Sequence, residues 1–86
     1  MSAQQSTAWT VYIVECRDQT LYTGIAKDVH QRVQAHNDGR GAKYTAGRRP
    51  VTLIYQEQAP DRSAAQVREH AIKQLNAKQK RELMSS

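Results

Sequence analysis

The sequence of 86 residues has little cysteine, few aromatic side chains and no long apolar run. It contains no Phe, one Trp and one Cys. A single cysteine excludes an internal disulfide, and Cys16 has neither a CxxC partner nor a nearby His with which to form a metal cluster. No apolar run approaches the roughly 20 residues that span a bilayer. This composition predicts one domain with no membrane association, working in a reducing cytoplasm.

Residues 1–8 are polar and lack the apolar core of a secretory signal, so we expect a disordered leader there. The single domain is then expected to cover residues 9–84. A chain this short buries only about 60% of its unfolded surface. Its large side chains, such as Trp9 and Leu53, are therefore expected to serve a small core.

Two short runs near the start predict a β-hairpin. Residues 9–15 (WTVYIVE) and 20–26 (TLYTGIA) are rich in β-branched and aromatic residues. Strands this close in sequence pair with each other, so Tyr12 and Tyr22 are expected to lie near one another. Gly24 in the second strand indicates either a close backbone approach or a bulge, which is a structural role.

The next segment predicts a helix over residues 29–38, with Asp28 as its N-cap and Gly39 as its stop. Arg32 and His36 are four residues apart and therefore neighbours on one side of that helix. Both flank its apolar stripe, where a long Arg side chain can reach the hairpin.

The second half predicts a basic loop over residues 39–50, a strand over 51–56 and a helix that ends near Asn76. Either Asp61, or Ser63 in a capping box with Gln66, begins this helix. The helix carries two apolar strips: Ala64, Val67, Ala71 and Leu75 form the stronger one, and Glu69, Ile72 and Asn76 form the other.

A final basic helix is expected over residues 78–84. The predicted order is ββαβαα. We therefore expect an α/β (α+β) domain with a small three-stranded antiparallel sheet and flanking helices.

The formal net charge is +5, and the basic residues are concentrated in the middle of the chain. The central stretch holds Lys27, Arg32, Arg40, Lys43, Arg48 and Arg49, opposed by Asp28 and Asp38. This distribution favours a polyanionic partner, nucleic acid first. The alternative is a generic basic surface.

Phosphodiester hydrolysis needs an activated water, a cation at the phosphoryl oxygens and usually a metal ion. Arg32 suits the second task because its guanidinium pairs with phosphate oxygens and stays charged. A lone carboxylate such as Glu69 can hold Mg²⁺, which keeps most of its waters. A tyrosine acts as a base only if its pKa falls from ~10 toward neutrality, and Arg32 or a metal is the expected cause.

Each of these residues also has an ordinary structural interpretation. Tyr12 and Tyr22 fit strand aromatics, Arg32 a solvated helix residue, and His36 a surface or capping histidine. Glu69 also fits an i, i+4 pair with Lys73. Only the joint occurrence of these residues points to a site.

The ordered set resembles the GIY-YIG nuclease domain, in particular its small single-domain UPF0213 subgroup. Residues 10–12 (TVY) stand where the family has Gly-Ile-Tyr, and residues 22–24 (YTG) stand where it has Tyr-Ile-Gly. Arg32 matches the catalytic arginine of the family, His36 a frequent active-site histidine, and Glu69 the metal-binding glutamate. The segment 41–45 with Arg49-Pro50 is similar to a loop of the subgroup.

The chain departs from the family pattern at Thr10 and Thr23, which replace Gly and Ile and remove no catalytic side chain. Asn76 is a candidate for a late helical Asn of the family, although it follows Glu69 closely. Larger relatives of the family append a targeting domain, and we expect none in this chain. We therefore expect target selection by the basic loop, a homo-oligomer or a protein partner.

The resemblance implies a one-metal endonuclease that acts on DNA, with structured or branched DNA in repair or recombination as the expected substrate. Tyr12 or Tyr22 would orient or deprotonate water with help from His36, Arg32 would stabilise the phosphoryl group, and Glu69 would hold one Mg²⁺ or Mn²⁺ ion. The expected nucleic-acid contacts are Lys27, Arg40, Lys43, Tyr44, Arg48 and Arg49. The alternatives are a nucleic-acid-binding module with little or no turnover and an interaction domain whose charge maintains solubility.

Overall fold

The computed structural model describes residues 8–84, which contain one antiparallel sheet of three strands. Strands β1 (Trp9–Glu15), β2 (Leu21–Ala26) and β3 (Thr52–Ala59) lie in the order β2-β1-β3. The predicted α+β class, sheet and hairpin are confirmed. The leader predicted for residues 1–8 lies outside the described residues, except for Ala8.

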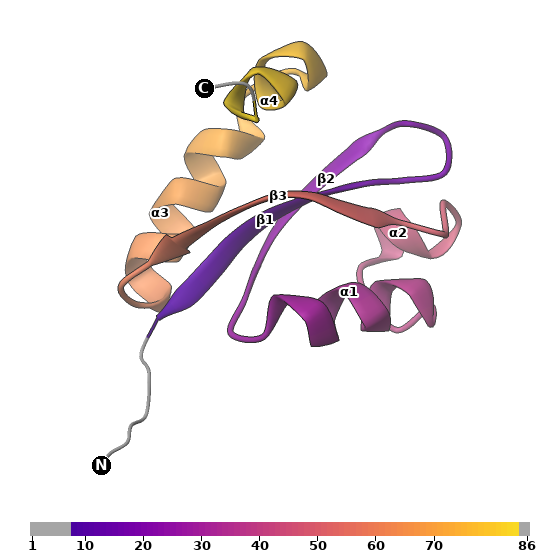
Figure 1. The fold of residues 1–86 in the computed structure, drawn as a ribbon, viewed down its shortest axis with the longest axis horizontal. Coiled ribbons are helices and arrows are strands. Elements are labelled where there is room, and N and C mark those ends of the chain that lie inside the picture. The colour runs from indigo at the N-terminus through magenta and orange to yellow at the C-terminus, as the bar shows by residue number, and fades with distance from the viewer. Residues whose placement is uncertain (1–7, 85–86) are drawn as a thin grey trace.

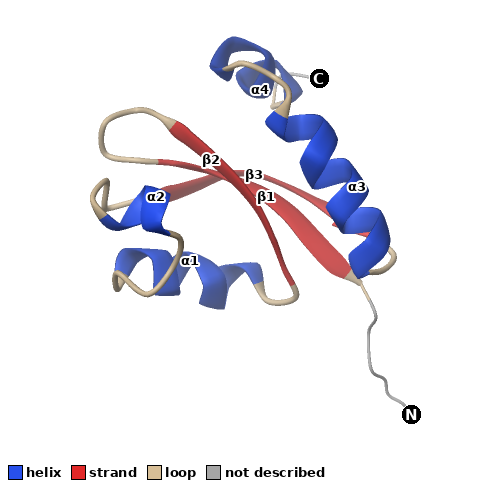
Figure 2. Ribbon diagram, turned by 180° about the vertical axis from the view of Figure 1, so that it is seen from behind, coloured by secondary structure: helices blue, strands red, loops and turns tan. Residues whose placement is uncertain are grey.

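The helices cover both faces of the sheet. Helices α1 (Val29–Asn37) and α2 (Lys43–Ala46) lie on one side, while α3 (Arg62–Lys73) and α4 (Ala77–Leu83) lie on the other (Figures 1 and 2). The element order is therefore ββααβαα, and the prediction of a plain loop over residues 39–50 was wrong. A helix as short as α2 leaves no periodic pattern in the sequence. No helix within residues 8–84 is long and apolar enough to cross a membrane.

Strand β1 is buried on both faces because it is the central strand. Tyr12 and Val14 pack with Val29 on the α1 side of the sheet. Val11 and Ile13 pack with Ile72 on the α3 side. Alternate residues of a strand point to opposite faces, so β1 supplies both cores.

The helix ends are set by side-chain caps. The Asp28 carboxylate accepts a hydrogen bond from the Gln31 amide, which confirms the predicted start of α1. Asp61, and not Ser63, caps α3. Helix α3 ends at Lys73, so the prediction that it continues to Asn76 was wrong. Asn76 instead caps α4.

The buried face of α3 differs from the stronger apolar strip in the sequence. Val67 is 71% exposed, whereas Ala65 and Ile72 are fully buried. Glu69 lies on the Ile72 side of the helix and is half-buried. The strip with fewer apolar residues therefore faces the sheet, and it brings Glu69 with it.

Strand β3 is also longer than predicted and runs to Ala59 because Ala59 pairs with Trp9 of β1. The expected end at Gln56 is three residues short. The added residues extend the sheet toward the start of α3 and leave the candidate site residues unchanged.

Candidate active site

The phenol of Tyr12 lies across the neighbouring strand at Gly24. The two residues are paired in the β1–β2 ladder, which has no irregularity at this point. A Cβ built on Gly24 would lie 2.5 Å from the Tyr12 hydroxyl oxygen. Of the two predicted roles for Gly24, the structure shows the close approach. Glycine here lets the Tyr12 hydroxyl extend over β2.

Hydrogen bonds join the Tyr12 hydroxyl to His36, His36 to Thr45, and Thr45 to a backbone carbonyl oxygen. The Tyr12 oxygen lies 2.8 Å from His36 Nε2, and His36 Nδ1 lies 2.8 Å from Thr45 Oγ1. The Thr45 hydroxyl donates its one hydrogen to the Ala42 carbonyl oxygen at 2.9 Å. Thr45 must therefore accept from His36 Nδ1–H. A neutral imidazole with its hydrogen on Nδ1 accepts at Nε2, so Tyr12 is the donor to His36.

Two residues that hold His36 in place had no recognisable catalytic pattern in the sequence. Thr45 is fully buried in α2. Gly41 passes so close to His36 that a Cβ there would collide with Nδ1. His36 itself is fully buried, so its interpretation as a surface histidine was wrong. A glycine in a loop and a threonine in a four-residue helix reveal such a role only when this segment folds back on α1.

Burial sets the protonation of the Tyr12–His36 pair. Burial raises the pKa of Tyr12 to about 12, and this outweighs the hydrogen bond and positive charge of Arg32, which lower it. The pKa of His36 is lowered, first by burial and then by the charge of Arg32. Near neutral pH the phenol is therefore protonated and the imidazole neutral. The expected fall of a tyrosine pKa toward neutrality is not present for Tyr12.

Tyr22 lies on the same face of the sheet. Its ring meets the His36 ring edge to face, with centroids 5.4 Å apart. The Tyr12 and His36 rings are 5.9 Å apart. The structure thus brings together the two tyrosines, Arg32 and His36, as the spacing predicted.

Glu69 approaches the site from α3. Its side chain is 21% exposed and its carboxylate lies 3.2 Å from Lys73 Nζ, which is the expected i, i+4 pair. The Glu69 charge also contributes to raising the pKa of Tyr12, as the smallest of its causes, so the carboxylate acts on the phenol through charge. No group of three or more His, Cys, Asp or Glu within residues 8–84 could hold a metal ion. Glu69 fits a single carboxylate ligand to an ion that keeps most of its waters, as Mg²⁺ does.

The predicted nucleic-acid contacts fall into two groups. Lys27 and Arg40 line a cavity of about 320 Å³ together with Arg32. Lys43 is exposed at the start of α2. Arg40 also pairs with Asp38 at 2.8 Å. Of the proposed site residues, Arg32 is the one that shares this cavity with Lys27 and Arg40.

The other group is engaged with protein groups. Arg49 donates to the carbonyl oxygens of Ala46 at 2.8 Å and Asn37 at 3.4 Å, at the ends of α2 and α1. Tyr44 stacks on Tyr22, with ring centroids 5.8 Å apart. Arg48 lies over the Tyr44 ring.

Comparison with known proteins identifies one family. Residues 8–82 match the model of the GIY-YIG catalytic domain. The chain is 52% identical to a UPF0213 protein of Desulfotalea psychrophila over 92% of its own length and 73% of the relative. It is 51% identical to a UPF0213 protein of Staphylococcus saprophyticus over 87% of its own length and 92% of the relative.

Solved structures resemble the whole domain. The chain is similar to the solution NMR structure of the UPF0213 protein BH0048 from Bacillus halodurans, with 40% identity, a TM-score of 0.57, and coverage of 91% of this chain and 83% of that one. It is also similar to the solution NMR structure of the protein EF2693 from E. faecalis, with 34% identity, a TM-score of 0.61, and coverage of 99% and 90%.

Proposed function

Because this chain belongs to the GIY-YIG catalytic domain family, we propose that it is a metal-dependent endonuclease that hydrolyses phosphodiester bonds in DNA. Structured or branched DNA in repair or recombination is the proposed substrate. The observation that carries the proposal is the Tyr12–His36 hydrogen bond, whose direction Thr45 and Ala42 determine. It places a buried acceptor behind the Tyr12 hydroxyl, and Arg32, whose charge acts on this phenol, lines a basic cavity.

The proton chemistry starts from a protonated phenol. With a pKa of about 12, Tyr12 cannot take a proton from water and keep its own. His36 Nε2 is neutral and 2.8 Å away. As a water gives its proton to the Tyr12 oxygen, the phenolic proton passes to His36 Nε2. Tyr12 is favoured over Tyr22 as the base because Tyr22 meets His36 only through its ring edge.

Arg32 is the residue proposed to stabilise the phosphoryl group in the transition state. Its guanidinium lies near enough to the Tyr12 hydroxyl to lower the pKa of that phenol. The same group also lines the basic cavity. A preorganised cation at this place opposes the negative charge that develops on the phosphoryl oxygens.

Glu69 is the residue proposed to hold one Mg²⁺ or Mn²⁺ ion. When bound, such an ion neutralises charge on phosphoryl oxygens and makes a bound water more acidic. Glu69 must leave Lys73 to serve as the ligand. The charge of Glu69 already acts on the pKa of Tyr12, and a cation bound by this carboxylate would lower that pKa.

We further propose that Lys27, Arg40 and Lys43 contact phosphates that flank the cleaved bond. Direct contacts of Tyr44, Arg48 and Arg49 with nucleic acid stay predictions, since these side chains have protein partners here. A protein partner or a homo-oligomer is proposed to supply target selection.

The test is a cleavage assay on branched, flapped and plain duplex DNA with Mg²⁺. Arg32→Ala and Glu69→Gln are each expected to lose about 100- to 1000-fold in rate, because each removes a charge that acts in the transition state. Glu82→Gln, an exposed acid on α4, is the matched control and should cleave like wild type. Equal cleavage by all four proteins would assign the activity to a contaminant and refute the proposal.

A binding module without turnover is the second candidate. The raised pKa of Tyr12 and the pairing of Glu69 with Lys73 favour it. It predicts no cleavage with any divalent metal, together with DNA affinity that falls by about 0.9 log unit per log unit of salt for each phosphate contacted.

A further inference from the structure

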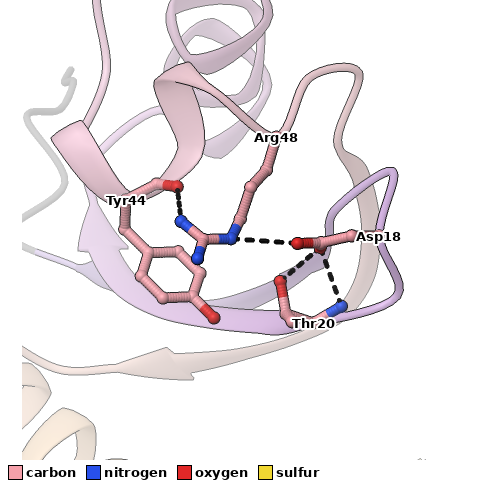
Figure 3. A network of polar contacts seen from close by, with 4 residues as sticks. All are labelled: Asp18, Thr20, Tyr44 and Arg48. Atoms are coloured by element: carbon pink, nitrogen blue, oxygen red, sulfur yellow. Dashed lines mark hydrogen bonds and ion pairs between the residues drawn. The ribbon is translucent and has the colours of Figure 1, made fainter.

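A network of four side chains joins the hairpin turn to Tyr44. The Asp18 carboxylate accepts from the Thr20 hydroxyl at 2.6 Å and from the Thr20 amide at 3.2 Å. The other oxygen of Asp18 accepts from Arg48 Nε at 3.1 Å. Figure 3 shows the Arg48 guanidinium between this carboxylate and the Tyr44 ring.

Arg48 is fixed in both directions. Its Nη1 donates to the Tyr44 carbonyl oxygen at 2.8 Å, and its Cζ lies 4.1 Å from the centroid of the Tyr44 ring. Its own carbonyl oxygen accepts from the Arg17 amide at 2.9 Å, which ties its backbone to the hairpin turn. Arg48 thus clamps the Tyr44 ring from the outside.

The clamp reaches the candidate active site through Tyr22. The Tyr44 and Tyr22 rings are stacked, 5.8 Å apart and inclined by 29°. Tyr22 in turn meets His36 at 5.4 Å. Within residues 8–84 the Tyr22 hydroxyl makes no hydrogen bond, so packing alone holds this ring. Tyr22 stands on β2, an edge strand of the sheet, and Tyr44 supplies the support that a further strand would give.

We propose that Asp18 and Arg48 are positioning residues that act through Tyr44 to hold the Tyr22 ring against His36. The inference deepens the proposed nuclease function and rests on it. It gives Arg48 a task other than direct phosphate binding. A misplaced group of about 1 Å near the reacting atoms can cost about 100-fold in rate, so a contact this indirect can still control turnover.

The two tasks of Arg48 predict opposite results for the same variants. If Arg48 bound phosphate directly, Asp18→Asn would release it and tighten DNA binding. Arg48→Lys would keep the positive charge and most of the affinity. If Arg48 positions Tyr22, Asp18→Asn lowers turnover without tightening binding, and Arg48→Lys fails because a lysine lacks the planar fork that spans Asp18 and Tyr44.

The first experiment separates kcat from KM on the DNA that wild type cleaves. Asp18→Asn, Arg48→Lys and Tyr44→Leu are each expected to lower kcat by about 10- to 100-fold, with KM within about twofold of wild type. Tyr44→Phe keeps the stacked ring, so its kcat should match that of wild type. A lowered KM in Asp18→Asn, or a wild-type kcat in Arg48→Lys, would overturn the proposal.

Arg81→Ala is the matched control. Arg81 also joins a distant segment to the same hairpin, through Glu15 at 2.8 Å and the Gln19 carbonyl oxygen at 3.2 Å. Its side chain is 40% exposed and that of Arg48 is 39% exposed. It contacts no ring of the site, so its loss should leave kcat unchanged. An equal loss of kcat would mean that the whole hairpin matters and would overturn the specific role of Arg48.

The second experiment needs no activity, so it stands even if the nuclease proposal fails. In protein with ¹³C-labelled tyrosine, NMR should show a Tyr22–Tyr44 ring contact in wild type and Tyr44→Phe. Asp18→Asn and Arg48→Lys should lose this contact and shift the Tyr22 ring resonances, while the rest of the spectrum shows a folded domain. Unchanged Tyr22 resonances in both variants would overturn the proposal.

Discussion

The two sides of the sheet are held together by different kinds of interaction. The α1–α2 side holds a buried chain of polar groups, in which Tyr12, His36 and Thr45 each have a defined hydrogen-bond role. The α3–α4 side holds an apolar cluster around Ile13 and Ile72. Ion pairs cross from this side to the strands, and their side chains are partly exposed.

This difference decides how each side responds to change. Hydrogen bonds in a buried chain depend on distance and angle, and a buried group that loses its partner is costly. Apolar packing has no direction, and exposed ion pairs contribute little. The α1–α2 side should therefore fail in function after small steric changes, while the α3–α4 side tolerates the loss of surface contacts.

The largest effect is expected for Gly41→Ala, because the new Cβ would collide with His36 Nδ1. His36 must move, so the Tyr12 hydroxyl loses its acceptor. Overpacking of this kind costs about 1–3 kcal/mol in the free energy of unfolding, and the cleavage rate should fall by at least about 100-fold. Urea unfolding and the cleavage assay measure the two effects.

Gly47→Ala is the control for this change, since no atom lies within 4 Å of a Cβ built there. Its stability and rate should match wild type. If Gly41→Ala also matched wild type, the geometry of the α1–α2 side would be as tolerant as that of the α3–α4 side.

A smaller effect is expected from acid. The lowered pKa of His36 means that the unfolded chain takes up a proton below about pH 6.5, where the folded protein does not. The free energy of unfolding therefore falls as pH drops below about 6.5, by at most about 1.4 kcal/mol per pH unit. Urea unfolding across this pH range measures the slope.

His36→Gln should lack this slope, whatever its stability at neutral pH. His70→Gln removes an exposed histidine on α3 and should keep it. A slope that survives in His36→Gln would place the titrating group elsewhere in the protein.

The smallest effect is expected for Arg68→Ala on the α3–α4 side. Arg68 Nε lies 2.7 Å from Glu57, and the two side chains are 44% and 25% exposed. Its loss should cost about 0–1 kcal/mol, reduced further by salt, with no change in cleavage rate. Thermal unfolding at low and high salt tests this. A loss above about 2 kcal/mol would mean that this side also depends on directional contacts.

Features that depend on the spacing of nearby residues could be predicted from the sequence. Two strands with a short turn bring Tyr12 and Tyr22 together, and one helical turn brings Arg32 and His36 to one side. Asp28 begins α1 because a side-chain cap acts within one turn. These rules need no knowledge of the rest of the fold.

The parts that could not be predicted depend on distant contacts. Thr45 and Gly41 gain their roles only because α2 folds back against α1, and a four-residue helix gives no periodic signal. The burial of Glu69 depended on which strip of α3 meets the sheet. Ile72 is fully buried on the strip that meets the sheet, although the other strip has more apolar residues.

The chain from Tyr12 through His36 and Thr45 ends at the Ala42 carbonyl oxygen, an acceptor that cannot pass a proton on. His36 can therefore store one proton and has no second exit through this chain. In the proposed mechanism, each turnover must therefore return that proton through the phenol before the next can begin. The resetting of the site and its chemistry thus share a single route, and a bound product that covers Tyr12 would block both.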